Sequence, residues 1–85
     1  MNLKVGYIYK LEAHIDLDKW KSVVLLTEKD EEHDRYIFKE LEIIWNGKKE
    51  EPDNSWDPSI SYLKNNKGFK FTEVGSKNKH PEYFL

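Results

Sequence analysis

The stretch "HIDLD" places a histidine and two aspartates, His14, Asp16 and Asp18, at every second residue. Side chains two residues apart on a β-strand project from the same face. Imidazole and carboxylate groups on one face form a partial ligand set for a divalent ion. No second cluster in the sequence completes that set. We therefore interpret the stretch as a polar turn and expect neither a metal site nor a cofactor.

Other residue types that support catalysis lack the partners they need. The chain has no cysteine nucleophile, its serines lack a glycine-framed elbow, and no glycine-rich phosphate loop is present. Adjacent glutamates occur at 31–32 and 50–51. General acid catalysis, however, requires a carboxyl group in an apolar pocket that raises its pKa. Neighbouring glutamates in polar stretches do not predict such a pocket, so we expect that the protein is not an enzyme.

Aromatic and acidic residues are better candidates for a binding function. Trp56 lies in the polar stretch "EEPDNSWDPS", and tryptophan is a frequent anchor of protein interfaces. It can equally cover one end of a small core. Carboxylates held on a rigid scaffold can present an acidic patch to a basic partner. The acidic residues that we predict to bind a partner together with Trp56 are Glu31, Glu32, Asp34, Glu50, Glu51, Asp53 and Asp57.

Charge is distributed unevenly along the chain. The formal net charge is −2, but residues 1–63 carry −5 and residues 64–85 carry +3. The basic part interleaves lysines with Phe69 and Phe71 in "KNNKGFKF". Single-stranded nucleic acids are bound by lysines beside aromatic rings that stack on bases. Single-strand binding is therefore our alternative to protein binding.

The chain ends on three apolar residues, Tyr83, Phe84 and Leu85. Burial of a large apolar side chain contributes about 1.5–3 kcal/mol, which favours folding of this tail back onto a domain with little core. The same residues could dock into a groove on a partner. We expect one domain over residues 1–76 and a docked tail over residues 77–85.

Three segments read as strands. "KVGYIYKLE" alternates apolar and polar residues, and "WKSVVLLTEK" is apolar on both faces. "RYIFKELEIIW" fits a strand by its period of two, but its apolar residues also fit a helical stripe. We favour the strand, because its aromatic and β-branched residues are strand formers, and keep an α+β fold with a helix at 31–46 as the alternative.

The second half of the chain contains turn and helix signals. Asn46-Gly47 predicts a type I′ turn leading to a polar edge strand. Asp57 as N-cap, Pro58 at the first helical position and Gly68 after the end predict a short helix near residues 58–66. "FKFTEV" then reads as the last strand.

About five short strands with one late helix resemble a small SH3-like barrel, so the expected fold is mainly β. The Lys, Asn and Ile bias of this short chain is similar to that of small accessory proteins encoded by phages. That resemblance implies an inhibitor or modulator of a host protein. With no signal peptide and no long apolar run, we expect a cytoplasmic location, without membrane contact, as a monomer or homodimer.

Overall fold

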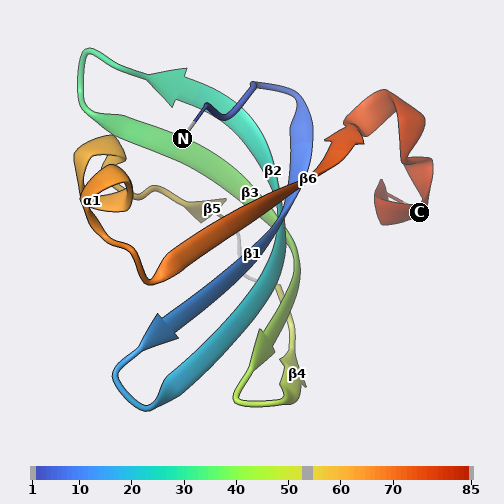
Figure 1. Ribbon diagram of the computed structural model, residues 1–85. Coiled ribbons are helices and arrows are strands. Elements are labelled where there is room, and N and C mark those ends of the chain that lie inside the picture. Colours follow the sequence, from blue (N-terminus) through green and yellow to red (C-terminus); the bar gives the residue numbers. More distant parts are fainter. Residues whose placement is uncertain (1, 53–54, 85) are drawn as a thin grey trace.

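A computed structural model describes residues 2–52 and 55–84, which form a strongly curved antiparallel sheet with one short helix (Figure 1). The predicted mainly β fold is confirmed, and so is the short helix near residues 58–66. In chain order the elements are β1 (Tyr7–Ile15), β2 (Asp18–Asp30), β3 (Arg35–Trp45), β4 (Lys48–Glu50), β5 (Ser55–Trp56), α1 (Ile60–Asn65) and β6 (Phe69–Ser76), followed by two 3-10 turns (Lys77–Lys79 and Pro81–Phe84).

The strands pair in the order β4-β3-β2-β1-β6, and β5 pairs with Phe38 and Lys39 of β3, on the edge that β4 also uses. Tight turns connect β1 through β4. Asn46 and Gly47, between β3 and β4, have φ angles of 49° and 83°. Two consecutive positive φ angles are what a type I′ turn requires, so the predicted turn is confirmed.

Residues 35–45, which fit both a strand and a helix by sequence, form the strand β3. This strand pairs with β2 along its whole length and with β4 and β5 on its other edge. Both ends of the strand are therefore paired on two sides, and Tyr36 and Phe38 are fully buried. Pairing with neighbouring strands decides between two patterns that the local sequence supports almost equally.

Aromatic rings fill the concave face of the sheet. The Phe38 ring stacks on Trp56 of β5 at 5.3 Å between centroids and on Phe71 of β6 at 5.8 Å. Trp56 also meets Phe69 at 6.0 Å. The sheet is open as a hydrogen-bonded structure, and these rings connect its two sides across the core. Stacked and edge-to-face aromatic pairs contribute more than their buried area alone.

The helix begins later than the sequence suggests. We predicted Asp57 as the N-cap, but the N-cap is Ser59, whose hydroxyl accepts the Tyr62 N–H at 3.2 Å. The reason is a bond to the sheet: the Pro58 carbonyl accepts the Tyr36 N–H at 3.0 Å. Residue 58 is therefore held beside β3, and helical geometry starts after it.

The C-terminal residues 77–84 lie against the convex face of the sheet at one end. Pro81 and Phe84 share a hollow with Leu25, and the Lys39 Nζ lies 5.9 Å from the centre of the Phe84 ring. His80 packs so closely on Gly75 that a Cβ there would lie 2.7 Å from the imidazole Nε2. Glycine at position 75 is therefore required for this contact.

Among the described residues, no helix is both long enough and apolar enough to cross a membrane.

Candidate functional site: the convex face of the sheet

The convex face gathers lysines from five strands. Residues paired across antiparallel strands point to the same face of a sheet, so the strand register places them in rows. Two adjacent rows are Lys70, Glu12, Lys21, Ile44 and Lys49, and Thr72, Lys10, Val23 and Glu42. Lys19, opposite His14, and Lys39, opposite Leu25, lie on the same face in the next row toward either end. We call the six lysines of this surface the lysine face: Lys10, Lys19, Lys21, Lys39, Lys49 and Lys70.

The lysine face is exposed and lacks internal charge pairing. The ion pairs of lysines with other described residues are Lys4–Glu73 and Lys29–Glu31, both outside this face. Lys21 lies directly opposite Glu12 without forming an ion pair. Lys39 contacts the Phe84 ring, and the other five ammonium groups form no ion pair, hydrogen bond or ring contact with a described side chain. These cations are available to an anionic partner.

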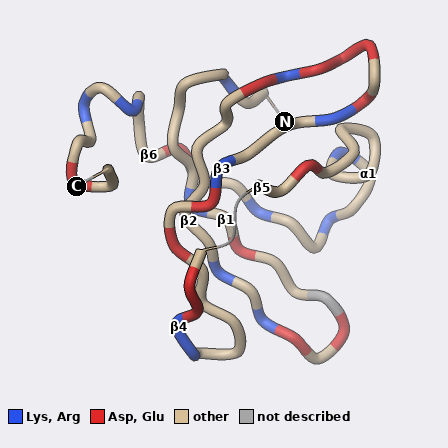
Figure 2. The backbone as a smooth tube through the Cα atoms, turned by 180° about the vertical axis from the view of Figure 1, so that it is seen from behind, with Lys and Arg blue, Asp and Glu red and all other residues tan. Residues whose placement is uncertain are grey.

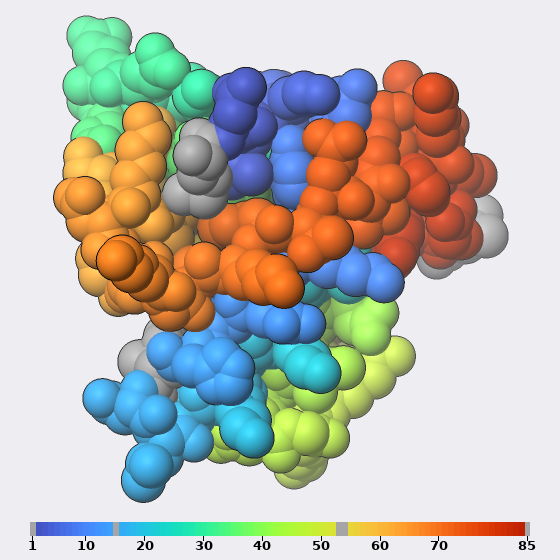
Figure 3. All heavy atoms as spheres, viewed as in Figure 1, coloured from blue at the N-terminus to red at the C-terminus, as the bar shows by residue number. Residues whose placement is uncertain are grey.

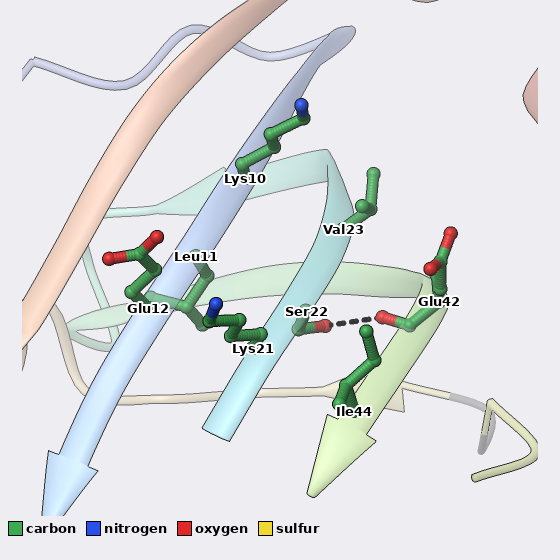
Figure 4. Close-up of a pocket in the computed structure, with 8 residues that line it drawn as sticks. All are labelled: Lys10, Leu11, Glu12, Lys21, Ser22, Val23, Glu42 and Ile44. Carbon is green, nitrogen blue, oxygen red and sulfur yellow. Dashed lines mark hydrogen bonds between the residues drawn. The ribbon is translucent and has the colours of Figure 1, made fainter. Parts of the chain in front are cut away.

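The face has a small apolar centre. A shallow groove of about 180 Å³ has the half-buried Val23 and Ile44 within it and Lys10 and Glu42 at its rim (Figure 4). Below them the Ser22 hydroxyl donates a 2.9 Å hydrogen bond to the Glu42 carbonyl. The β2–β3 pairing shifts register after Val23, and such a bulge increases the local twist. The result is a mixed surface with cations around an aliphatic patch.

The charge of this face is opposite to that of the chain. Six lysines and two glutamates, Glu12 and Glu42, give the face +4, whereas the whole chain carries −2. All other residues together therefore carry −6. A fixed concentration of one charge on one surface steers partners of the opposite charge toward it.

The predicted acidic set is divided between two ends of the molecule. Glu31 and Glu32 lie in the β2–β3 turn, whereas Glu50 ends β4 and pairs with Ile43 (Figure 2). Eight residues of β3 separate these ends, which corresponds to roughly 26 Å of extended strand. The remaining members are Asp34 and Asp57 near the turn, Glu51 beside β4, and Asp53, which lies outside the described residues.

Asp34 has a structural role that the sequence did not indicate. Its carboxylate accepts hydrogen bonds from the Ser59 hydroxyl at 2.7 Å, the Ser61 hydroxyl at 2.9 Å and the Ser61 N–H at 3.1 Å. The hydrogen bonds from Ser59 and Ser61 lower the pKa of Asp34 below its ordinary value. Asp34 thus joins the β2–β3 turn to the first turn of α1 and is engaged within the domain.

Trp56 packs mainly inside the domain. Its ring lies 4.9 Å from that of Trp20, in addition to its contacts with Phe38 and Phe69, and it touches both hydrophobic clusters of the core. It remains half-buried. Of the two interpretations of Trp56, the cover over one end of the core agrees with these contacts.

The three tail residues differ in their surroundings. Tyr83 is half-buried beside His80, with 6.4 Å between the ring centres. Phe84 is 41% exposed and lies against Lys39. Leu85 lies outside the described residues. The tail therefore borders the lysine face and covers the row that contains Leu25.

The early metal candidates do not assemble. Asp16 occupies the β1–β2 turn with a φ of 55°, and Asp18 accepts a 3.0 Å hydrogen bond from the Asn46 amide. Over residues 2–52 and 55–84, no three histidine, aspartate or glutamate side chains gather as a metal site requires.

Sequence reasoning missed the lysine face because its members come from five strands. A charge tally by segment averages the two faces of each strand, and it made residues 1–63 look acidic. The available signal was the alternation inside individual strands, such as Lys19 and Lys21 on either side of the buried Trp20.

No protein-family model matches this chain, and neither does any curated protein or solved structure.

Proposed function

We propose that this protein is a non-catalytic protein-binding domain whose lysine face docks onto an acidic surface of its partner. The observation that carries the proposal is a group of exposed lysines without ion pairs to other described residues, on a chain with a net negative charge. A rigid sheet fixes their spacing at about 4.8 Å between strands and about 6.6 Å along a strand. Partner carboxylates at similar spacing would find the cations already in place.

The composition of the face favours a protein over a nucleic acid. Glu12 and Glu42 stand among the lysines and interrupt the cationic surface that a continuous phosphate backbone would follow, whereas a partner protein can place its carboxylates opposite the lysines alone. The groove presents the aliphatic side chains Val23 and Ile44, whereas single-strand binding relies on aromatic rings that stack on bases. A partner with an apolar residue among carboxylates fits both features.

Three carboxyl groups have lowered pKa values, which supports a binding role rather than acid catalysis. Partial burial alone would raise the pKa of Asp30, but hydrogen bonds from His33 and Arg35 lower it overall. The pKa of Asp34 and that of Glu82 are lowered as well. A general acid needs the reverse, a carboxyl group that stays protonated near neutral pH.

Occupation of an acidic surface would make the domain an inhibitor or modulator of its partner. The similarity to phage accessory proteins stays a prediction.

The proposal is tested with a labelled twelve-residue glutamate peptide and a labelled twelve-residue oligothymidylate. Fluorescence anisotropy at low and moderate salt should show salt-sensitive binding of the peptide, at least tenfold tighter than that of the oligonucleotide. The variant Lys10→Glu/Lys21→Glu should lose at least tenfold in peptide affinity. Stronger binding of the oligonucleotide would overturn the proposal in favour of the single-strand alternative.

A matched control separates the lysine face from net charge. Lys64→Glu/Lys67→Glu changes the chain charge by the same amount at two exposed lysines in and just after α1. We expect this control to retain peptide affinity within about twofold. Equal losses in both double variants would show that only total charge matters, which contradicts a defined binding face.

A further inference from the structure

Within the part of the chain that the structure describes, one edge of β6 has no strand beside it. β6 pairs with β1, and no backbone hydrogen bond joins its other edge to a residue in the described ranges (Figure 1). An open edge carries unpaired N–H and C=O groups that can template another strand. In Figure 3 the residues of β6 (orange) lie at the front surface, beside α1 and below the N-terminal segment (dark blue).

The register identifies the backbone groups that point outward. The His14 N–H donates to the Gly68 carbonyl, and the Lys77 N–H donates to the Gly6 carbonyl. Hydrogen-bonded and non-hydrogen-bonded pairs alternate along an antiparallel ladder. Lys70 and Thr72 therefore direct their backbone groups to β1. The backbone groups of Phe69, Phe71 and Glu73 point away from the sheet.

The space beside this edge is lined by aromatic rings. A hollow of about 440 Å³ borders β6 and is lined by Leu3, Tyr9, Phe69 and Phe71, together with the charged Lys70 and Glu73. Both phenylalanine rings are only half-buried. On the opposite face the edge carries the exposed, unpaired Lys70, in register with the lysine face.

We propose that β6 accepts an extended peptide segment of a partner protein as an additional strand, one with alternating apolar and acidic residues. Segment residues opposite Phe69 and Phe71 would point to the concave side and bury apolar side chains against the rings. The residues between them would point to the convex side, next to Lys70. Backbone bonds supply affinity in this mode of recognition, and alternate side chains supply specificity.

A foreign segment fits better than a second copy of the chain. Two β6 strands paired around Phe71 would place Glu73 of one copy opposite Phe69 of the other, which sets a carboxylate against an aromatic ring. This mode shares Lys70 with the lysine face, but it is distinct from the proposed function because it uses the backbone edge of β6 rather than the lysine groove.

The free protein gives the first test, by amide hydrogen exchange measured with NMR. The amides of Lys70 and Thr72 should be protected by β1, whereas those of Phe69, Phe71 and Glu73 should exchange at least tenfold faster. Equal protection of all five amides would show that the edge is already covered, and would overturn the inference.

The second test adds an eight-residue peptide of alternating valine and glutamate with blocked ends. Binding should slow exchange at the three outward amides at least fivefold. A peptide of alternating valine and lysine, and one with four valines followed by four glutamates, should bind at least tenfold more weakly. Chemical-shift changes at Lys10 and Lys21 without protection of β6 would place the peptide on the lysine face and overturn strand addition.

Substitutions then separate edge pairing from general charge. Glu73→Pro removes an outward N–H that the fold does not use, since proline is tolerated on edge strands. It should abolish peptide binding while the thermal midpoint stays close to that of the parent chain. If this variant fails to fold, Lys70→Glu provides the readout and should weaken the valine–glutamate peptide at least fivefold. The inference is contradicted if Glu73→Pro folds and binds the peptide as the parent chain does, or if, in its place, Lys70→Glu binds the peptide unchanged.

Discussion

The two faces of this sheet are built from alternate residues of the same strands, yet they relate to water in opposite ways. Trp20, on the concave face, lies against two aromatic rings. Its sequence neighbour Lys21, on the convex face, is exposed and forms no ion pair within residues 2–52 and 55–84. The concave face holds Phe38 at full burial, whereas the groove on the convex face is floored by two half-buried aliphatic residues.

This contrast indicates how a chain of 85 residues can build a core on one face of its sheet and still leave the other face exposed. A small domain buries a modest fraction of its surface, so its core has to be dense. Here the density comes from rings on one face. The other face then remains free for solvated charge, and substitutions on it should affect binding more than stability.

The largest expected effect comes from removal of a concave-face ring. Trp56→Ala should destabilise the fold by about 3 kcal/mol, because large-to-small substitution of packed aromatic residues leaves a cavity. Trp56 contacts rings from β2, β3 and β6, so the loss affects both hydrophobic clusters. Urea denaturation measures the change. A loss below about 1 kcal/mol would return Trp56 to the role of a surface anchor.

Ile43 and Ile44 are neighbours in sequence, and their side chains lie on opposite faces of the sheet. Substitution of each by the same residue therefore compares the two faces directly. Ile43 packs against the hydrophobic cluster of Leu11, Ala13 and Trp20, whereas Ile44 lines the convex groove. Ile43→Lys should cost about 2 kcal/mol, because a charge enters an aromatic environment, and Ile44→Lys should change the free energy of unfolding by less than about 1 kcal/mol. Thermal and urea melts of both variants provide the measurement. Equal losses would mean that the convex face contributes as much to folding as the concave face.

The sequence predicts the elements of this fold better than their contacts. The turn at Asn46-Gly47 and the helix after Pro58 follow from local backbone preferences, and both are observed. The N-cap could not be chosen between Asp57 and Ser59 from sequence, because both side chains are good caps. A hydrogen bond from β3 to Pro58, distant in sequence, makes the choice.

The candidate site was harder to predict for a geometric reason. The acidic runs around residues 31 and 50 look like one patch in a charge tally, but β3 separates them along its length. The lysine face has the opposite property, since its members are dispersed in sequence and assembled by strand pairing. Only the register of the sheet shows which charges are neighbours.

The third prediction concerns Asp34, which connects the turn of the sheet to α1. Because hydrogen bonds lower its pKa in the folded state, the charged form contributes stability that is present above the unfolded pKa of about 3.9 and is lost as the pH falls through the lower folded value. Asp34→Asn should lower the thermal midpoint by several degrees at pH 7. The difference from the parent chain should shrink below about pH 4.

Thermal melts between pH 2.5 and 7 measure this dependence. Asp34→Ala should be less stable than Asp34→Asn at every pH, because residue 34 has a φ of 51°, a conformation that asparagine tolerates better than alanine. A difference between the parent chain and Asp34→Asn that is constant over the whole pH range would contradict the assigned role.

The smallest expected effects come from two tyrosine hydroxyls on the concave face. The Tyr9 hydroxyl accepts the Lys4 N–H at 2.7 Å, whereas the Tyr36 hydroxyl is buried without a hydrogen-bond partner among the described residues. Removal of a paired group costs about 1 kcal/mol, and removal of a buried unpaired group relieves its desolvation. Tyr9→Phe should therefore destabilise the fold by about 1 kcal/mol, and Tyr36→Phe should stabilise it by a similar amount. Urea denaturation of the two variants measures both signs in one experiment. If Tyr36→Phe instead lowered stability, its hydroxyl would have a bonded partner, and the concave face would be more polar in character than its ring packing indicates.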